Sequence, residues 1–355
     1  MNTNMKRLRA LRTTLSEKNI SALLVSREEN RYYLSGFSGS SGLLLVTADK
    51  QLLATDFRYI EQVKQQSPDF SLFETKGEIA KWFPEFVSGL GLKELFFEAD
   101  DITFERYSKI KEILAALDIE IKPSTGIVED LRAVKEAGEI ALVERAVAVS
   151  DAALEHIRVF AKPGMTELQM AWEIEKHMRE HGSEAVPFEV IVAAGKNAAL
   201  PHHRPSDYVV RAGEPIVIDI GAKCEGYASD LTRTICLGKE DNRFRTIYDI
   251  ALKAQLTAEA QIAAGMSGGQ ADAIARDIIG AAGYGDNYGH GLGHGVGLVI
   301  HEKPHVGITS KDILKNGMVF TVEPGIYLPE WGGVRIEDTV VMEHGKIRVL
   351  SSSMK

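Results

Sequence analysis

Leucines recur at helical spacing near the start of the chain. Leu8, Leu11 and Leu15 lie three and four residues apart, which predicts an amphipathic helix over residues 5–17. Short apolar runs bounded by Gly and Ser clusters follow, as is typical of strands. They cover residues 22–25, 43–46, 52–54 and 95–97, before a second helical pattern at 106–117. We therefore expect the first third of the chain to be a mixed α/β unit.

A long helical pattern begins near residue 128 and continues to Phe160, ahead of Pro163 and Gly164. The next helix is expected over residues 167–181. A chain of 355 residues is long enough for about two domains. We place the boundary at the start of the long helical stretch, which predicts domains of residues 1–130 and 131–355.

Two strand-like runs in the second domain each contain an aspartate. Asp219 lies in the apolar run 216–220, and Asp230 lies in the run 227–235. A hairpin turn centred just after Cys224 would set these aspartates directly opposite each other, with Cβ atoms roughly 5 Å apart.

Two carboxylates at that distance repel each other, and burying them costs several kcal/mol unless a cation compensates. A divalent metal ion is a natural compensation. The alternative is structural, with one acid in solvent and the other paired with Arg233.

A second acid pair repeats the spacing of the first. Both stretches read Gly-x5-acid-x-Gly followed by acid-x-Thr, from Gly213 to Thr232 and from Gly317 to Thr339. The second copy supplies Glu323, after the apolar run 319–322, and Glu337, within the run 334–341. The repeat predicts a duplicated strand–turn–strand unit that presents an acid pair each time.

Glycines and histidines alternate in residues 288–304. This segment contains His290, His294 and His301. Neutral imidazole is a common ligand of transition metals, and glycine lets the backbone approach a site closely. Beside four acids on apolar strands, these histidines indicate a metal site.

Two other interpretations of this segment fail on its sequence. No G-x-G-x-x-G or Walker pattern is present to hold phosphates. His301 to His305 reads H-E-x-x-H, the zinc-protease motif, but that motif requires a continuous helix. Pro304 would break such a helix at a cost of about 3 kcal/mol.

Composition excludes several classes of protein. The formal net charge is −9, which argues against nucleic acid or an anionic membrane surface as a partner. The two cysteines, Cys224 and Cys236, are too few for a secreted disulfide scaffold. No apolar run approaches the roughly 18 residues of a membrane span, and the basic start lacks the apolar core of a signal peptide. We therefore expect a cytoplasmic protein.

The ordered set of acids and histidine resembles the M24 metallopeptidases, which include aminopeptidase P, prolidase and methionine aminopeptidase. The matching strings are Val217–Ala222, Ser229–Thr234, Gly289–Pro304, Thr321–Gly325 and Gly333–Asp338. In the first domain, Asn30–Phe37 and Asp56–Tyr59 resemble the creatinase-type N-terminal domain of the proline-directed members. The resemblance implies an α+β fold, with a pita-bread (creatinase/aminopeptidase) C-terminal domain preceded by a smaller α/β creatinase-type N-terminal domain.

The resemblance also implies a pair of divalent metal ions, with Mn²⁺ favoured by oxygen-rich ligands and Co²⁺ or Zn²⁺ as alternatives. The implied metal ligands are Asp219, Asp230, His294, Glu323 and Glu337. The implied catalytic residues are His202, His301, Glu323, His290 and Arg335. Among these, Glu323 would shuttle a proton and Arg335 would brace Asp219. Without the resemblance, His202 would be interpreted as a surface residue of its loop.

Hydrolysis of Xaa-Pro bonds by a homodimer is the activity that this resemblance implies. Dipeptidase relatives often carry an arginine after the His-Glu-x-Pro stretch to bind the substrate carboxylate. Residues 303–316 contain Lys303, His305, Lys311 and Lys315 but no arginine, so dipeptidase and aminopeptidase both stay open, and we favour the broader aminopeptidase assignment. A creatinase-like amidinohydrolase and a non-catalytic peptide-binding module are further alternatives on the same fold.

Overall fold

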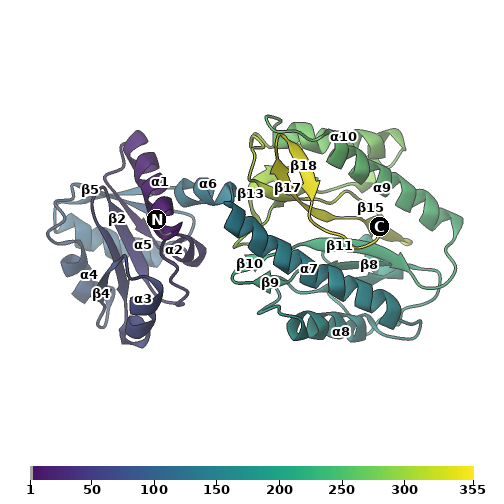
Figure 1. Ribbon diagram of the computed structural model, residues 1–355, viewed down its shortest axis with the longest axis horizontal. Helices are drawn as coiled ribbons and strands as arrows, with labels where there is room; N and C mark the ends of the chain where they lie inside the picture. The colour runs from purple at the N-terminus through teal and green to yellow at the C-terminus, as the bar shows by residue number, and fades with distance from the viewer. Residues whose placement is uncertain (1–2) are drawn as a thin grey trace. The chain divides into compact units, whose positions relative to one another are not determined.

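The computed structural model describes residues 3–355, in which the chain forms two compact units (Figure 1). The first unit ends at Arg132, and the second spans Ala133–Lys355. Among the described residues, no helix combines the length and the apolar character needed to cross a bilayer.

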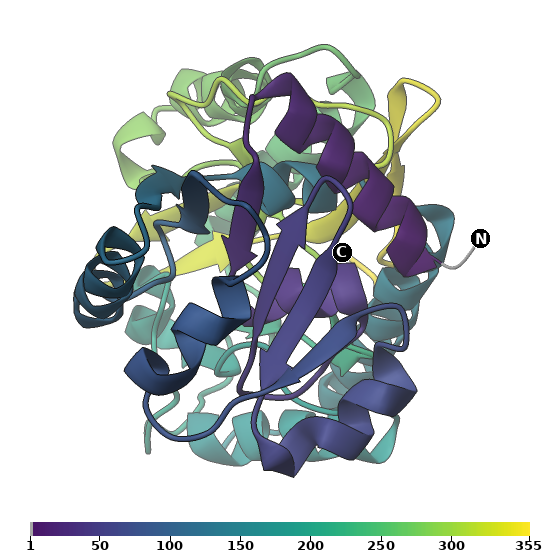
Figure 2. The same cartoon turned by 90° about the vertical axis from the view of Figure 1, so that its left-hand side faces the viewer.

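The first unit is built on one six-stranded sheet, which faces the viewer in Figure 2. Its strand order is β4-β3-β2-β1-β5-β6, in which β2 is antiparallel to both β1 and β3 and the other pairs are parallel. All four predicted strands are present, each within two residues of the predicted ends. The elements are α1 (Thr3–Glu17), β1 (Ala22–Val25), α2 (Glu28–Ser35), β2 (Leu43–Thr47), β3 (Gln51–Thr55), η1 (Phe57–Tyr59), α3 (Ile60–Gln66), β4 (Ser71–Glu74), α4 (Ile79–Val87), β5 (Glu94–Glu98), α5 (Phe104–Ala115) and β6 (Glu120–Ser124).

The predicted long helix from residue 128 is wrong in one respect. It is two helices, α6 (Ile127–Ala133) and α7 (Ala137–Phe160), separated by three residues. A capping box between Glu136 and Glu139 begins α7. Val134 forms a β-bridge with Met318, so the chain cannot remain helical at that point.

The second unit places its strands between two pairs of helices (Figure 1). Helices α7 and α8 pack on one sheet, β11-β8-β7, through residues such as Leu154, Ile174 and Ile218. Helices α9 and α10 pack near the other sheet, β13-β12-β14-β17-β18, around Phe320 and Val340. The two apolar cores therefore lie on the helix side of each sheet.

The remaining elements complete the second unit. They are α8 (Glu167–Glu180), β7 (Ile191–Ala194), η2 (Gly195–Ala199), β8 (Pro215–Ile220), β9 (Lys223–Cys224), β10 (Tyr227–Ala228), β11 (Leu231–Cys236), α9 (Asn242–Gln261), α10 (Gly268–Ala281), η3 (Gly285–Asn287), β12 (Gly293–Gly295), β13 (Glu302–Val306), β14 (Val319–Val322), β15 (Gly325–Leu328), β16 (Gly332–Arg335), β17 (Asp338–Glu343) and β18 (Lys346–Val349).

Candidate metal centre

The first acid hairpin runs from β8 through β9 and β10 to β11. Its turn is centred between Glu225 and Gly226, both with positive φ, so the predicted centre after Cys224 is wrong. Asp219 consequently pairs with Thr232, two residues beyond Asp230. An even shift leaves side chains on the same face of a strand, so the two aspartates still point to one side.

The second acid hairpin has the same plan, with β14 and β17 at its base and β15 and β16 at its tip. The predicted continuous strand over residues 334–341 is wrong, because Ile336 and Glu337 interrupt it between β16 and β17. Val322 pairs with Asp338 and Gly325 pairs with Arg335. The same register, continued through the break, sets Glu323 across from Glu337.

Threonines connect the two hairpins in a reciprocal way. Thr232 of the first hairpin donates its hydroxyl to Glu337 Oε2 at 2.5 Å. Thr339 of the second donates to the carbonyl oxygen of Asp230 at 2.7 Å. These are the two threonines of the repeated acid-x-Thr pattern, so each copy braces the acid of the other.

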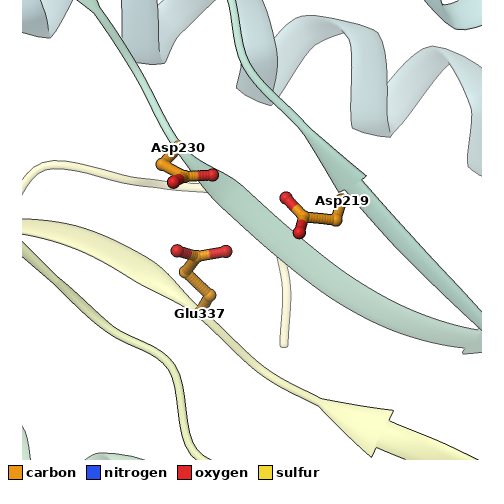
Figure 3. A group of neighbouring side chains, drawn as sticks. All are labelled: Asp219, Asp230 and Glu337. Atoms are coloured by element: carbon orange, nitrogen blue, oxygen red, sulfur yellow. The ribbon is translucent and has the colours of Figure 1, made fainter. Parts of the chain in front are cut away.

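The acids converge between the sheets (Figure 3). Carboxylate oxygens of Asp219, Asp230 and Glu337 lie within 4.8 Å of one another. The Nε2 atom of His294, on β12, lies 3.5 Å from Asp230 Oδ2 and 3.4 Å from Glu323 Oε1. The structure thus brings together all five residues that the sequence selected as metal ligands.

The electrostatics of this cluster favour a bound cation. Burial raises the pKa of Asp230, and the carboxylates of Glu337 and Asp219 raise it further. Burial likewise raises the pKa of Glu337, with contributions from Glu323 and Asp219. The buried Oδ1 atom of Asp219 has no hydrogen-bond partner in the described residues. A divalent ion would offset the repulsion and engage that oxygen, so the residues present fit a metal.

The structural alternative for the first acid pair does not hold. Arg233 is buried and forms an ion pair of 2.7 Å with Asp338, not with Asp230. It also donates to the carbonyl oxygen of Glu337. The Arg233 guanidinium therefore anchors the backbone beside the cluster and does not pair with Asp230.

Arg335 is the guanidinium that contacts the cluster itself. Its Nη2 atom donates to Asp219 Oδ2 at 2.7 Å, which is the brace that the family resemblance implied. Its Nη1 atom donates to the hydroxyl of Tyr327 at 2.8 Å. The same hydroxyl lies 2.9 Å from His290 Nε2, so a buried chain of contacts connects His290 to Asp219.

Three further histidines surround the cluster. Burial lowers the pKa of His290. The ring of His301 packs against that of His294 with centroids 4.2 Å apart, and partial burial together with the imidazoles of His294 and His202 lowers its pKa to about 4. His202 is exposed and lines the same cavity. These groups can offer N–H donors beside the carboxylates.

A cavity of about 360 Å³ opens onto the cluster. Besides the nine sequence-selected residues, apolar side chains contribute to its wall. The lining residues are Phe188, Glu189, Ile191, Pro201, His202, His203, Arg204, Asp219, Asp230, His290, Gly291, Gly293, His294, Ile300, His301, Glu323, Arg335 and Glu337. The space is sufficient for a small organic substrate next to a metal.

The sequence did not identify Tyr327, Phe188 or the bracing threonines. The threonines carried a signal, because both copies of the repeat contain them. Tyr327 is one residue of a buried strand, and no spacing marks it. The zinc-protease interpretation fails in the structure as well, since Glu302–Val306 forms strand β13 and no helix.

Fold and site together define a hydrolase-like metal centre, built from carboxylates of two matched hairpins and one imidazole. Comparison with known proteins agrees. Residues 141–344 match the metallopeptidase family M24, and residues 7–134 match the creatinase/prolidase N-terminal domain. The chain belongs to metallopeptidase family M24, and its second unit has the pita-bread fold.

Similar proteins extend over nearly the whole chain. The Xaa-Pro dipeptidase of Pyrococcus furiosus is 36% identical over 350 residues, which cover 97% of each chain. The solved Xaa-Pro dipeptidase from Bacillus anthracis has a TM-score of 0.96 at 40% identity, covering 99% of this chain and 98% of that one. The solved X-Pro aminopeptidase from Thermotoga maritima MSB8 has a TM-score of 0.89 at 35% identity, covering 96% and 98%.

Proposed function

We propose that this metallopeptidase hydrolyses the bond between an N-terminal residue and proline, using two divalent metal ions. The observation that carries the proposal is the cluster of Asp219, Asp230 and Glu337, extended by His294 and Glu323. The Xaa-Pro bond comes from the names of the similar dipeptidases and aminopeptidase.

Each ligand has a proposed place in the site. Asp219 would hold one ion, His294 and Glu323 would hold the other, and Asp230 and Glu337 would serve both. The oxygen-rich set favours Mn²⁺, with Co²⁺ or Zn²⁺ as alternatives. When bound, such a pair supplies Lewis acidity and an activated water for attack on a carbonyl carbon.

The other residues act on the substrate or on the ligands. His202 and His301 line the cavity beside the cluster and donate N–H groups to the oxygen of the scissile carbonyl. Glu323, whose pKa is raised by burial, moves a proton toward the leaving nitrogen of proline. Arg335 fixes the orientation of Asp219, and His290 acts through Tyr327 to hold Arg335.

An assay with Ala-Pro and Ala-Ala tests the activity. The Mn²⁺-loaded protein should cleave Ala-Pro and leave Ala-Ala intact, and a chelator should abolish cleavage. Metal analysis should give about two ions per chain, as a two-metal site requires. The variant Asp230→Asn should lose both turnover and the metal pair while keeping its circular dichroism spectrum. Normal turnover in that variant, or no metal after reconstitution, would favour the amidinohydrolase or peptide-binding alternatives.

Cellular context forms the last part of the proposal. We assign the protein to the cytoplasm, where its free thiols at Cys224 and Cys236 would stay reduced. We further propose that it is a homodimer. Light scattering on the purified protein tests this, since a monomer mass at micromolar concentration would refute it.

A further inference from the structure

The cavity contains a cationic side chain that the metal centre does not use. Two arginines line the cavity, Arg335 and Arg204. Arg335 is 3% exposed and fully engaged by Asp219, Tyr327 and the carbonyl oxygen of Pro201. Arg204 has a side chain that is 85% exposed and, among the described residues, forms an ion pair with another exposed residue of the cavity wall, Glu189. Arg204 is thus the guanidinium able to meet a substrate.

The basic residues between 303 and 316 do not share this position. The sequence offered Lys303, His305, Lys311 and Lys315 as candidates for binding a substrate carboxylate. None of these four residues lines the cavity. The cation at the cavity comes instead from the loop that follows η2, two residues after His202.

That loop is held firmly on both sides of Arg204. Glu167, which is fully buried, lies 2.8 Å from His203 Nε2 and accepts from the backbone N–H of Ser206 at 3.0 Å. Pro205 restricts the backbone of Arg204, because a residue before proline is confined to extended conformations. The position of the Arg204 backbone is therefore fixed, while its side chain can pivot between Glu189 and the cavity.

The existing ion pair is easily exchanged. The Nε atom of Arg204 lies 3.1 Å from Glu189 Oε2, and the side chain of Glu189 is 62% exposed. Exposed pairs of this kind contribute about 0–1 kcal/mol. A planar guanidinium can accept a carboxylate in a two-point contact, which a lysine ammonium cannot match.

We propose that Arg204 binds the free carboxylate of an Xaa-Pro dipeptide and so makes dipeptides the preferred substrates. The assignment rests on the Xaa-Pro activity proposed above. In a dipeptide the carboxylate is attached to the proline itself, one residue from the scissile bond. In a longer peptide that position is a neutral amide, and the charge lies further away. Arg204 therefore favours dipeptidase activity over aminopeptidase activity.

The contact lies away from the reacting atoms. It should stabilise the bound substrate and the transition state equally, so its loss should raise KM and leave kcat unchanged. A charge contact made by an exposed guanidinium changes affinity by about two- to five-fold. The kinetics of Ala-Pro amide, which lacks the C-terminal carboxylate, should not change.

The test measures kcat and KM for Ala-Pro, Ala-Pro amide and Ala-Pro-Ala with the Mn²⁺-loaded full chain. The wild type should show its lowest KM with Ala-Pro. Arg204→Met should raise the KM for Ala-Pro by about two- to five-fold, with the kinetics of the amide unchanged. Arg204→Lys should fall between the two, and Glu189→Gln should lower the KM for Ala-Pro by freeing Arg204.

The outcomes separate the two proposals. Cleavage of Ala-Pro and its amide with similar KM values, in both wild type and Arg204→Met, overturns the role of Arg204 and leaves the Xaa-Pro activity standing. Failure of the wild type to cleave either substrate overturns the activity and the assignment that depends on it. Unchanged amide kinetics in Arg204→Met also serve as the folding control.

Discussion

Both units of the chain bury carboxylates, but they treat them differently. In the first unit Glu98 is 4% exposed and lies against the N-terminus of α2. It accepts hydrogen bonds from the backbone N–H of Ser26 at 2.6 Å, that of Arg27 at 2.8 Å and the side chain of Asn30 at 2.6 Å. Both carboxylate oxygens of this acid therefore have hydrogen-bond donors at the start of a helix.

The carboxylates of the second unit face one another instead. Burial and neighbouring carboxylates raise the pKa of both Asp230 and Glu337, and Asp219 keeps one buried oxygen without a partner in the described residues. Burial raises the pKa of Glu98 as well, to about 7, yet donors surround that group. The comparison teaches that burial of an acid does not by itself mark a site. What distinguishes this cluster is a set of facing carboxylates that includes an oxygen without a hydrogen-bond partner in the described residues.

The largest expected difference between the two units is in the effect of the same substitution, glutamate to glutamine, on activity. Glu337→Gln removes a proposed bridging ligand, so kcat/KM of the Mn²⁺-loaded protein on Ala-Pro should fall by more than about 100-fold, the upper cost of replacing a residue behind a metal ligand. Glu98→Gln makes the same chemical change in the other unit and should leave kcat/KM within about two-fold. Comparable losses in both variants would contradict the distinction.

The stability of the metal-free protein and that of the metal-loaded protein should depend on pH in opposite directions. The raised pKa values of Asp230 and Glu337 mean that their stabilising neutral forms are present at low pH and lost as pH rises. Metal binding needs the ionised forms, so its contribution of about 3–4 kcal/mol at saturation should shrink as pH falls from about 8 to about 5. Melting temperatures with and without Mn²⁺ across this range measure both trends. A shift on adding Mn²⁺ that does not depend on pH would count against the cluster as the binding site.

A smaller effect should appear in the first unit alone. The folded pKa of Glu98 is about 7 against an ordinary value of 4.5, so the stability that its neutral form provides is complete below about pH 4.5 and is lost as pH rises through about 7. The loss should be about 3 kcal/mol. Hydrogen exchange of amides in β1 and β5 should therefore accelerate with pH beyond its intrinsic dependence. Glu98→Gln should flatten this slope, and an unchanged slope would refute the role of Glu98.

The sequence predicted the elements better than their junctions. Apolar runs such as 22–25 and 43–46 mark strands because both faces of those strands are buried. The register of the first hairpin depends on which residues of the turn take positive φ. Glu225 does so, although glutamate is not a residue type from which a positive φ can be predicted. The break between α6 and α7 depends on a bridge to Met318, a contact far along the chain that local spacing does not encode.

The residues of the candidate site could be predicted from the sequence for a different reason. Its acids follow a repeated spacing, and an error of two residues in register keeps side chains on the same face of a strand. The predicted acids therefore still converge although the predicted turn is wrong. Tyr327 and Arg204 had no such support. Their roles follow from a hydroxyl placed between His290 and Arg335 and from a loop folded back onto the cavity, and both depend on tertiary structure.

The two threonines that each bond to the opposite hairpin have a consequence for how such a centre can arise. Thr232 bonds to the carboxylate of Glu337 and Thr339 bonds to the main-chain carbonyl oxygen of Asp230, so a solitary hairpin would lack both of these contacts. Two identical hairpins meeting across a twofold axis would supply both hydroxyls at once. Joined in one polypeptide, the halves are free to differ, and here only one side gains an imidazole.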